Sequence, residues 1–276
     1  MSQEFEWKPG AAGWLDVDGS NLEYICHGPQ PGDAPTIVML HEGLGSAKLW
    51  RDFPEKLAAA TGWGVFAYSR TGHGQSDLTD LPRPIDFMTL EAEQVVPRLL
   101  DAIDFQNGVL LGHSDGATIA AIYAGSIEDF RVRGLILMAP HFFTEPIGLQ
   151  EIARARTMFQ DQDLRQKMAR HHKDPDNTFH GWCDTWLDPR FETWDVSEVI
   201  DYLRVPVLAI QGREDQYGTL AQIAAVETRS YAPVDVEVIE DCRHSPHLDQ
   251  PDQTLALVET YLNRLQRIET EGHPET

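Results

Sequence analysis

Cysteine is scarce in this sequence. The 276-residue chain contains three cysteines, Cys26, Cys183 and Cys242. An odd number of cysteines without C-x-x-C spacing argues against a disulfide framework and against a structural zinc site. We therefore expect a reducing environment, and we predict neither a metal nor a cofactor.

Basic residues are few compared with acidic ones, and long apolar runs are absent from the sequence. The chain has 22 lysines and arginines against 44 aspartates and glutamates, a formal net charge of -22, and such a surface repels nucleic-acid phosphates and anionic lipid. No stretch approaches the ~20 apolar residues of a membrane helix, and the N-terminal sequence has no basic segment followed by an apolar one. We expect a cytoplasmic protein with a small-molecule substrate and no nucleic-acid or membrane partner. The sequence leaves the oligomeric state open.

Short apolar runs alternate with amphipathic helical stretches, which predicts an α/β fold. The first two strands flank Asp18-Gly19, a hairpin signal, so we expect the sheet to begin with an antiparallel pair. Six further runs are mostly aliphatic, as in parallel strands covered on both faces. The expected strands are 14–17, 22–26, 36–40, 64–68, 108–111, 134–138, 205–210 and 234–239. The expected helices are 89–104, with a kink at Pro97, 116–125, 219–229 and 252–267.

The segment 141–204 breaks this alternation, because it contains helical stretches and no strand-like run. We interpret it as a helical cap inserted between core segments 1–140 and 205–276. Its aromatic residues are Phe142, Phe143, Phe179, Trp182, Trp186, Phe191 and Trp194. Any one of them could serve only to pack the cap on the core. Together they predict an apolar lid, and we expect Phe142, Trp182 and Trp186 to contact the substrate.

The sequence GHSDG at 112–116 follows an expected strand and precedes an expected helix. This is the context in which G-x-S-x-G exposes a serine nucleophile on a strained turn, with glycines that leave room for it. The alternative is that Ser114 is only the polar end of a buried strand. A serine hydroxyl becomes reactive when a histidine takes its proton and an acid orients that histidine.

Candidates for both partners follow the ends of later strands. Asp215 comes after the strand 205–210, and His244 comes after the strand 234–239. Open α/β sheets build their sites at the carboxyl ends of strands. Taken singly, Asp215 could form a turn or cap a helix, and His244 could be a surface loop residue. The order Ser114, Asp215, His244 favours a catalytic triad.

With these motifs the chain resembles the α/β-hydrolase superfamily over nearly its whole length. The matching sequences are GHSDG at 112–116, GRED at 212–215 and HSPH at 244–247. The resemblance implies a mostly parallel eight-stranded sheet, with Ser114 as nucleophile, His244 as general base and Asp215 as orienting acid. The sequence HEGLG at 41–45 is similar to the oxyanion loop of the family, which implies that the backbone N–H groups of Gly43 and Asp115 bind the oxyanion.

Two residues depart from the family pattern, which usually has glycine at both positions. Glu42 follows His41, and Arg243 precedes His244. Glu42 could support the loop from behind, or its charge could face the pocket and discourage anionic acyl groups. Arg243 could be solvated, or it could pair with a substrate carboxylate. The turn at 69–74 resembles a structural turn of the family, and we assign it no catalytic role.

These motifs predict a serine hydrolase that cleaves a small to medium carboxylic ester through an acyl-enzyme. A C–C bond hydrolase of a vinylogous diketone, or a perhydrolase, would use the same triad. A non-catalytic receptor could hold a small molecule on the same fold. An epoxide hydrolase or dehalogenase would need aspartate in place of Ser114. The basic residues of the cap, Arg154, Arg156, Arg165, Lys167 and Arg170, look like solvated helix faces rather than a site for a dienoate carboxylate.

Overall fold

The computed structural model describes residues 5–161 and 163–271 and contains an eight-stranded sheet. The strand order is β1-β2-β4-β3-β5-β6-β7-β8. The two pairs β1–β2 and β2–β4 are antiparallel, and the pairs from β4 to β8 are parallel. The bounds are β1 Ala12–Val17, β2 Ser20–His27, β3 Thr36–Leu40, β4 Gly64–Tyr68, β5 Gly108–His113, β6 Val132–Met138, β7 Val207–Gly212 and β8 Val234–Ile239. The expected mostly parallel sheet is confirmed.

The first two strands form the hairpin that the sequence predicts. Val17 pairs with Ser20, so the loop consists of Asp18 and Gly19 alone. Both loop residues have positive φ, 53° and 82°, which is the backbone of a type I′ turn. This turn matches the right-handed twist of the flanking strands.

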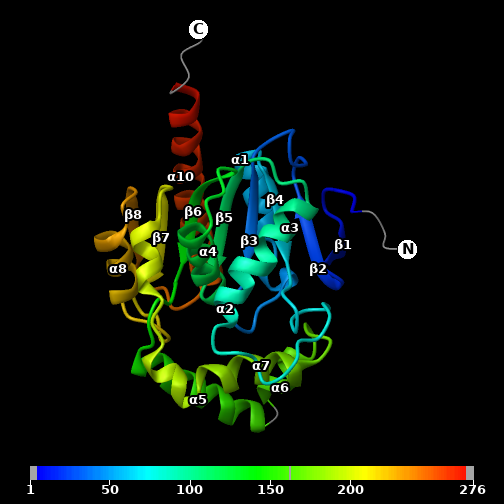
Figure 1. Cartoon of the computed structure of the whole chain (residues 1–276), viewed down its shortest axis with the longest axis vertical. Helices are drawn as coiled ribbons and strands as arrows, with labels where there is room; N and C mark the ends of the chain where they lie inside the picture. Colours follow the sequence, from blue (N-terminus) through cyan, green and yellow to red (C-terminus); the bar gives the residue numbers. More distant parts are fainter. Residues whose placement is uncertain (1–4, 162, 272–276) are drawn as a thin grey trace.

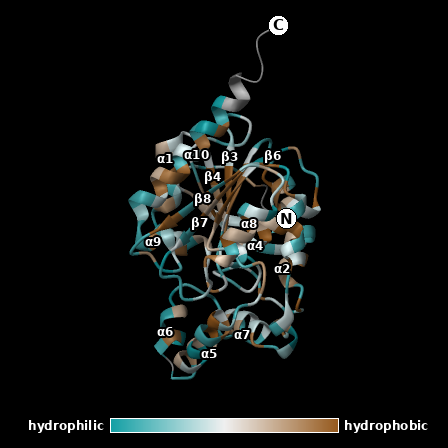
Figure 2. Ribbon diagram, turned by 90° about the vertical axis from the view of Figure 1, so that its left-hand side faces the viewer, coloured by the Kyte–Doolittle hydropathy of each residue, from teal (hydrophilic) through white to brown (hydrophobic). Residues whose placement is uncertain are grey.

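Helices cover both faces of the sheet (Figure 1). The helical bounds are η1 Ala47–Trp50, α1 Phe53–Thr61, α2 Phe87–Leu90, η2 Glu91–Val95, α3 Val96–Ala102, α4 Asp115–Ser126, α5 Pro146–Gln160, α6 Asp163–Met168, α7 Pro175–Trp186, η3 Pro189–Thr193, η4 Ser197–Tyr202, α8 Ala221–Arg229, α9 Pro246–Asp249 and α10 Pro251–Glu271. In β3, Ile37 and Met39 face α1 and α10, whereas Val38 and Leu40 face α4, because successive strand side chains point to opposite faces. Figure 2 shows the apolar strands enclosed between these layers.

The helix expected at 89–104 is divided into three pieces. A short α-helix, α2, runs into the π-helical turn η2, and α3 begins at Val96. Pro97 is the second residue of α3; it has no N–H to donate to the preceding turn, and its ring would crowd a carbonyl there. The wider turn before Pro97 relieves that clash.

The segment between β6 and β7 forms a separate layer at one end of the sheet. Figures 1 and 2 both show α5, α6 and α7 beyond the carboxyl ends of the parallel strands, at the end of the molecule opposite the exposed end of α10. Helices α5 and α7 pack on one another, and the rings of Phe159 and Phe179 stack with centroids 3.9 Å apart. In contrast, η4 packs against α4 and α8 of the core. This layer covers the edge of the sheet at which β3, β5, β7 and β8 end.

Candidate active site

Ser114 lies on a strained turn between β5 and α4. Its φ of 54° and ψ of -121° fall in a region that residues with a side chain rarely adopt. The glycines on either side make the turn feasible: a Cβ at Gly112 would lie 2.3 Å from the carbonyl oxygen of Gly116, and one at Gly116 would lie 2.0 Å from that of Leu40. The Ser114 N–H donates to the Met138 carbonyl at 2.9 Å, which ties the turn to β6.

Asp215 and His244 meet beside this turn. Their loops follow the adjacent strands β7 and β8, and His244 Nδ1 lies 2.9 and 3.0 Å from the two carboxylate oxygens of Asp215. Burial pushes the pKa of Asp215 upward, but the charge and hydrogen bond of His244 and the N–H of Tyr217 outweigh it and hold this pKa well below its usual range. An ionised Asp215 places the imidazole proton on Nδ1, which leaves Nε2 as a proton acceptor.

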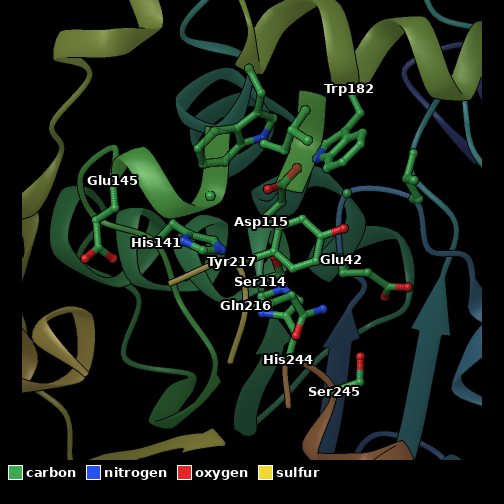
Figure 3. A pocket seen from close by; sticks show the side chains of 15 residues that line it. Glu42, Ser114, Asp115, His141, Glu145, Trp182, Gln216, Tyr217, His244 and Ser245 are labelled. Carbon is green, nitrogen blue, oxygen red and sulfur yellow. The ribbon is translucent and has the colours of Figure 1, made fainter. Parts of the chain in front are cut away.

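Ser114 and His244 both line a cavity of about 180 Å³ between the sheet edge and α5 and α7 (Figure 3). Its lining residues are Glu42, Gly43, Leu44, Ser114, Asp115, His141, Glu145, Gly148, Ile152, Trp182, Trp186, Gln216, Tyr217, His244 and Ser245. Within the described residues, the Ser114 hydroxyl makes no hydrogen bond to His244. Such hydrogen bonds are often long in the absence of substrate and tighten when it binds.

The structure brings two of the three expected substrate contacts to this cavity. Trp182 and Trp186 form part of its wall. Phe142 does not, contrary to the expectation, because its ring is fully buried in the core cluster. Its backbone N–H donates to the Gln222 side chain and its carbonyl accepts from the Val196 N–H. These two hydrogen bonds fix the backbone at Phe142 with the ring in the core.

The loop at 41–45 lies opposite the Ser114 turn, with Gly43 and Asp115 both on the cavity wall. Among the described residues, neither of these two backbone N–H groups donates to a protein acceptor. A Cβ at Gly43 would lie 2.2 Å from the indole nitrogen of Trp182, so the loop has room only for glycine here. Two free N–H groups beside a serine hydroxyl are the arrangement that binds a tetrahedral oxyanion.

The turn at 69–74 holds this loop from behind. Arg70 donates from Nη1 to the His41 carbonyl and from Nη2 to the Glu42 carbonyl, the latter at 3.0 Å. His73 Nε2 lies 3.0 Å from the carbonyl oxygen of Gly43. Arg70 and His73 are buried and have no place in the cavity lining. Their part in fixing the loop at 41–45 was not expected from the sequence.

Comparisons with known proteins agree with this geometry. A family model described as the alpha/beta hydrolase family matches residues 37–257. The chain belongs to this family. It is 26% identical over 265 residues to the non-heme chloroperoxidase of Streptomyces lividans, covering 85% of this chain and 93% of that protein. It is 24% identical to the proline iminopeptidase of Heyndrickxia coagulans, and the match covers 92% of this chain and 99% of that protein.

Solved structures share the fold of this alpha/beta hydrolase. The 2-hydroxy-6-oxo-6-phenylhexa-2,4-dienoate hydrolase from Rhodococcus sp. strain RHA1 superposes with a TM-score of 0.77 at 16% identity, covering 92% of this chain and 98% of that one. The matches confirm the resemblance inferred from GHSDG and its partner motifs. The chain is therefore a hydrolase with an α/β-hydrolase fold.

Glu42, which departs from the family pattern, faces a buried histidine. Its Oε2 lies 3.5 Å from Nδ1 of His113, and Nε2 of His113 donates to the His244 carbonyl at 2.7 Å. Burial raises the pKa of Glu42, but the facing His113 outweighs burial and lowers this pKa to about 2. Burial lowers the pKa of His113, but the facing Glu42 outweighs burial, and the net effect is a raised pKa. Glu42 and His113 thus link the loop at 41–45 to the loop that carries His244.

Arg243, the second departure, is exposed and does not line the cavity. Its backbone N–H donates to Asp249 at 2.9 Å. Of the two explanations that the sequence left open, the structure favours a solvated side chain. Pairing with a substrate carboxylate inside the cavity is not available to it in this arrangement.

His141 and Tyr217 also line the cavity, and no motif of the sequence pointed to them. The His141 ring lies 5.6 Å from that of His244, and the Tyr217 ring lies 4.7 Å from it. Burial lowers the pKa of His141 to about 3, so this side chain is neutral at working pH. Both residues follow strand ends by a few positions, as Asp215 and His244 do, and that placement was the signal available in the sequence.

No helix of the described residues is long and apolar enough to span a membrane. Across residues 5–161 and 163–271, no group of three or more His, Cys, Asp or Glu side chains is arranged to hold a metal ion.

Proposed function

We propose that this hydrolase cleaves small to medium carboxylic esters through an acyl-enzyme formed on Ser114. The observation that carries the proposal is the pair of Asp215 and His244, joined at 2.9 Å beside Ser114 on its strained turn. Ser114 and His244 line a cavity that has two tryptophans in its wall. The family membership and the motif order support the same reading.

In this mechanism, His244 Nε2 takes the proton of Ser114 as its oxygen attacks the ester carbonyl carbon. The negative charge that develops on the carbonyl oxygen is stabilised by the N–H groups of Gly43 and Asp115. Asp215 stabilises the imidazolium, which then protonates the departing alkoxide. Water, deprotonated by His244, attacks the acyl-enzyme and releases the acid and free Ser114.

The size and lining of the cavity support a substrate of modest size. A volume of about 180 Å³ suits a short acyl group with one compact apolar part. Trp182, Trp186 and Ile152 supply apolar wall, where each buried methylene contributes about 0.8 kcal/mol to binding. We propose that residues 141–204 act as a cap that provides this wall.

The reaction of a C–C bond hydrolase is less well supported. A dienoate substrate carries a carboxylate, yet no lysine or arginine is among the residues that line the cavity. Arg243 lies outside it. Perhydrolysis, in which hydrogen peroxide replaces water in the second step, stays a second candidate because of the 26% identity to a non-heme chloroperoxidase.

The test is a panel of short aryl and alkyl esters, a vinylogous diketone acid, and esters with added hydrogen peroxide. We expect the highest kcat/KM on a short ester, with turnover lost in Ser114→Ala. A large advantage for the diketone acid would contradict the ester proposal.

For the location of the protein in the cell, the three free, buried cysteines and the acidic composition support a cytoplasmic protein.

A further inference from the structure

The Asp115 carboxyl group lies in the cavity without a partner. Asp115 follows Ser114, is 2% exposed and lines the cavity wall. Figure 3 shows its carboxylate directed away from Ser114, toward Trp182 and the cap. In the part of the chain that the structure describes, no donor makes a hydrogen bond or ion pair to this carboxylate. The Trp186 indole N–H influences its pKa, yet that N–H has no acceptor within hydrogen-bond distance.

The other two carboxylates of the cavity wall are already engaged. Glu42 faces His113, as described above. Glu145 accepts hydrogen bonds from the Thr219 N–H at 3.0 Å, the Thr219 hydroxyl at 2.6 Å and Gln222 Nε2 at 2.7 Å. Asp115 is therefore the carboxylate of this wall that is available to a ligand.

The surroundings of Asp115 leave its carboxyl without a neutralising partner. Burial raises the pKa of this carboxyl, and the positive charges of Arg70 and Arg83 oppose that rise without cancelling it. A bound cation would favour the ionised form. Both arginines direct their N–H groups elsewhere: Arg70 to the carbonyls of His41 and Glu42, and Arg83 to that of Thr71 at 2.6 Å. No lysine or arginine is among the residues that line the cavity.

A charged Asp115 is at odds with the proposed oxyanion site unless a cation joins it. Its own backbone N–H is one of the two proposed oxyanion donors. The carboxylate also borders the other donor, since its Oδ2 lies 3.1 Å from the position that a Cβ on Gly43 would occupy. A negative charge beside a developing oxyanion opposes the reaction through like-charge repulsion. A positive group of the substrate, placed between them, removes that repulsion and favours the transition state.

We infer that Asp115 binds an ammonium group next to the scissile carbonyl, so that the enzyme acts on esters of α-amino acids. The inference rests on the proposed esterase function and names its substrate class. Because the side chain and the oxyanion donor belong to one residue, the group it reaches lies close to the acyl carbon, at the α position. Trp182 and Tyr217 line the same wall and offer aromatic faces that attract a cation.

The test compares alanine benzyl ester with benzyl propionate, which differs only by lacking the amino group. We expect wild-type kcat/KM to favour the alanine ester, in part because its ammonium group makes the carbonyl more electrophilic. In Asp115→Asn, which keeps the backbone donor and the side-chain shape, this ratio should fall by about 30-fold, the value of a hydrogen bond to a charged group. The matched variant Glu145→Gln should keep the ratio, because its carboxylate is engaged by Thr219 and Gln222.

A pH profile provides a second readout. The substrate ammonium loses its proton near pH 7.7–8.0, the ordinary range of an α-amino group, so kcat/KM for the alanine ester should decline above about pH 8 while that for the propionate ester does not. Equal wild-type values for the two esters, or an unchanged ratio in Asp115→Asn, would overturn the ammonium site and leave the esterase proposal standing.

If neither ester is cleaved in a Ser114-dependent reaction, the esterase proposal fails, and binding then decides the inference. Calorimetric titration of Ser114→Ala should show tighter binding of alanine benzyl ester than of benzyl propionate, with the difference lost in the Ser114→Ala, Asp115→Asn double variant. Equal affinities in the single variant would refute the ammonium site.

Discussion

Replacing Glu42 by glutamine removes the charge that faces His113 while keeping the length and polarity of the side chain. The lowering of the Glu42 pKa from 4.5 to about 2 corresponds to about 3 kcal/mol of preference for the ionised form in the folded protein. The side chain is 30% exposed, and solvent screening reduces this value. We therefore expect Glu42→Gln to lower the free energy of unfolding by about 2 kcal/mol at pH 6.

The pH dependence of this difference follows from the direction of the two pKa shifts. The folded-state pKa of Glu42 is depressed, so its contribution is present above pH 4.5 and is lost as the pH falls toward 2. The pKa of His113 is raised above its ordinary 6.5, so its contribution is present below that value and is lost as the pH rises through the folded-state pKa. The stability difference between wild type and Glu42→Gln should be largest between about pH 5 and pH 6.5.

Urea unfolding followed by tryptophan fluorescence, at several pH values from 4 to 8, measures this difference. Glu227→Gln is the control, because Glu227 is exposed on α8 and its replacement should change the unfolding free energy by less than about 0.5 kcal/mol. If Glu42→Gln matched this control at pH 6, or if its cost did not change with pH, the reasoning from the facing His113 would be refuted.

Three further predictions test the site. Ser114→Ala and His244→Ala should each lower kcat by several orders of magnitude, and the double variant should lose little more, because the two residues act together; near-wild-type turnover in either would remove it from the mechanism. His247→Ala should cost about 2 kcal/mol of stability, since its buried ring packs 4.7 Å from that of Trp50, but should leave kcat within about tenfold; loss of activity without loss of stability would reassign the base. Gly43→Ala should lower kcat by about 100-fold in a stopped-flow ester assay, because its Cβ would displace the oxyanion loop or the cap tryptophan beside it; an unchanged kcat would exclude this loop from oxyanion binding.

Most of the sheet could be predicted from the sequence because its strands are short aliphatic runs bounded by turn residues. Their position within the sheet could not. The run at 234–239 was expected, like the others, to be a parallel strand covered on both faces, but it is β8, the edge strand, and most of its side chains are only partly buried. Whether a strand is central or at the edge depends on the pairing of the whole chain, which one apolar run does not record. The helix α1, Phe53–Thr61, was not among the expected helices.

The positions of Ser114, Asp215 and His244 could be predicted because all three follow strands whose carboxyl ends meet at one edge. The supporting contacts could not, since they join distant segments: Glu42 meets His113, and Arg70 reaches back to the 41–45 loop. The aromatics of 141–204 show the same limit. Composition does not distinguish Trp182, in the cavity wall, from Phe142, in the core.

The cavity is built from two parts of the chain with different constraints. Ser114, Asp215 and His244 are spaced by the register of β5, β7 and β8, whereas Trp182 and Trp186 belong to α7, which lies outside the sheet. The proposed catalytic groups therefore tolerate little sequence change, while the cavity walls can be altered by changes confined to one inserted segment. A laboratory library restricted to α5 and α7 should shift the range of accepted esters while the cleavage chemistry stays constant, which makes this scaffold a modular starting point for new substrate preferences.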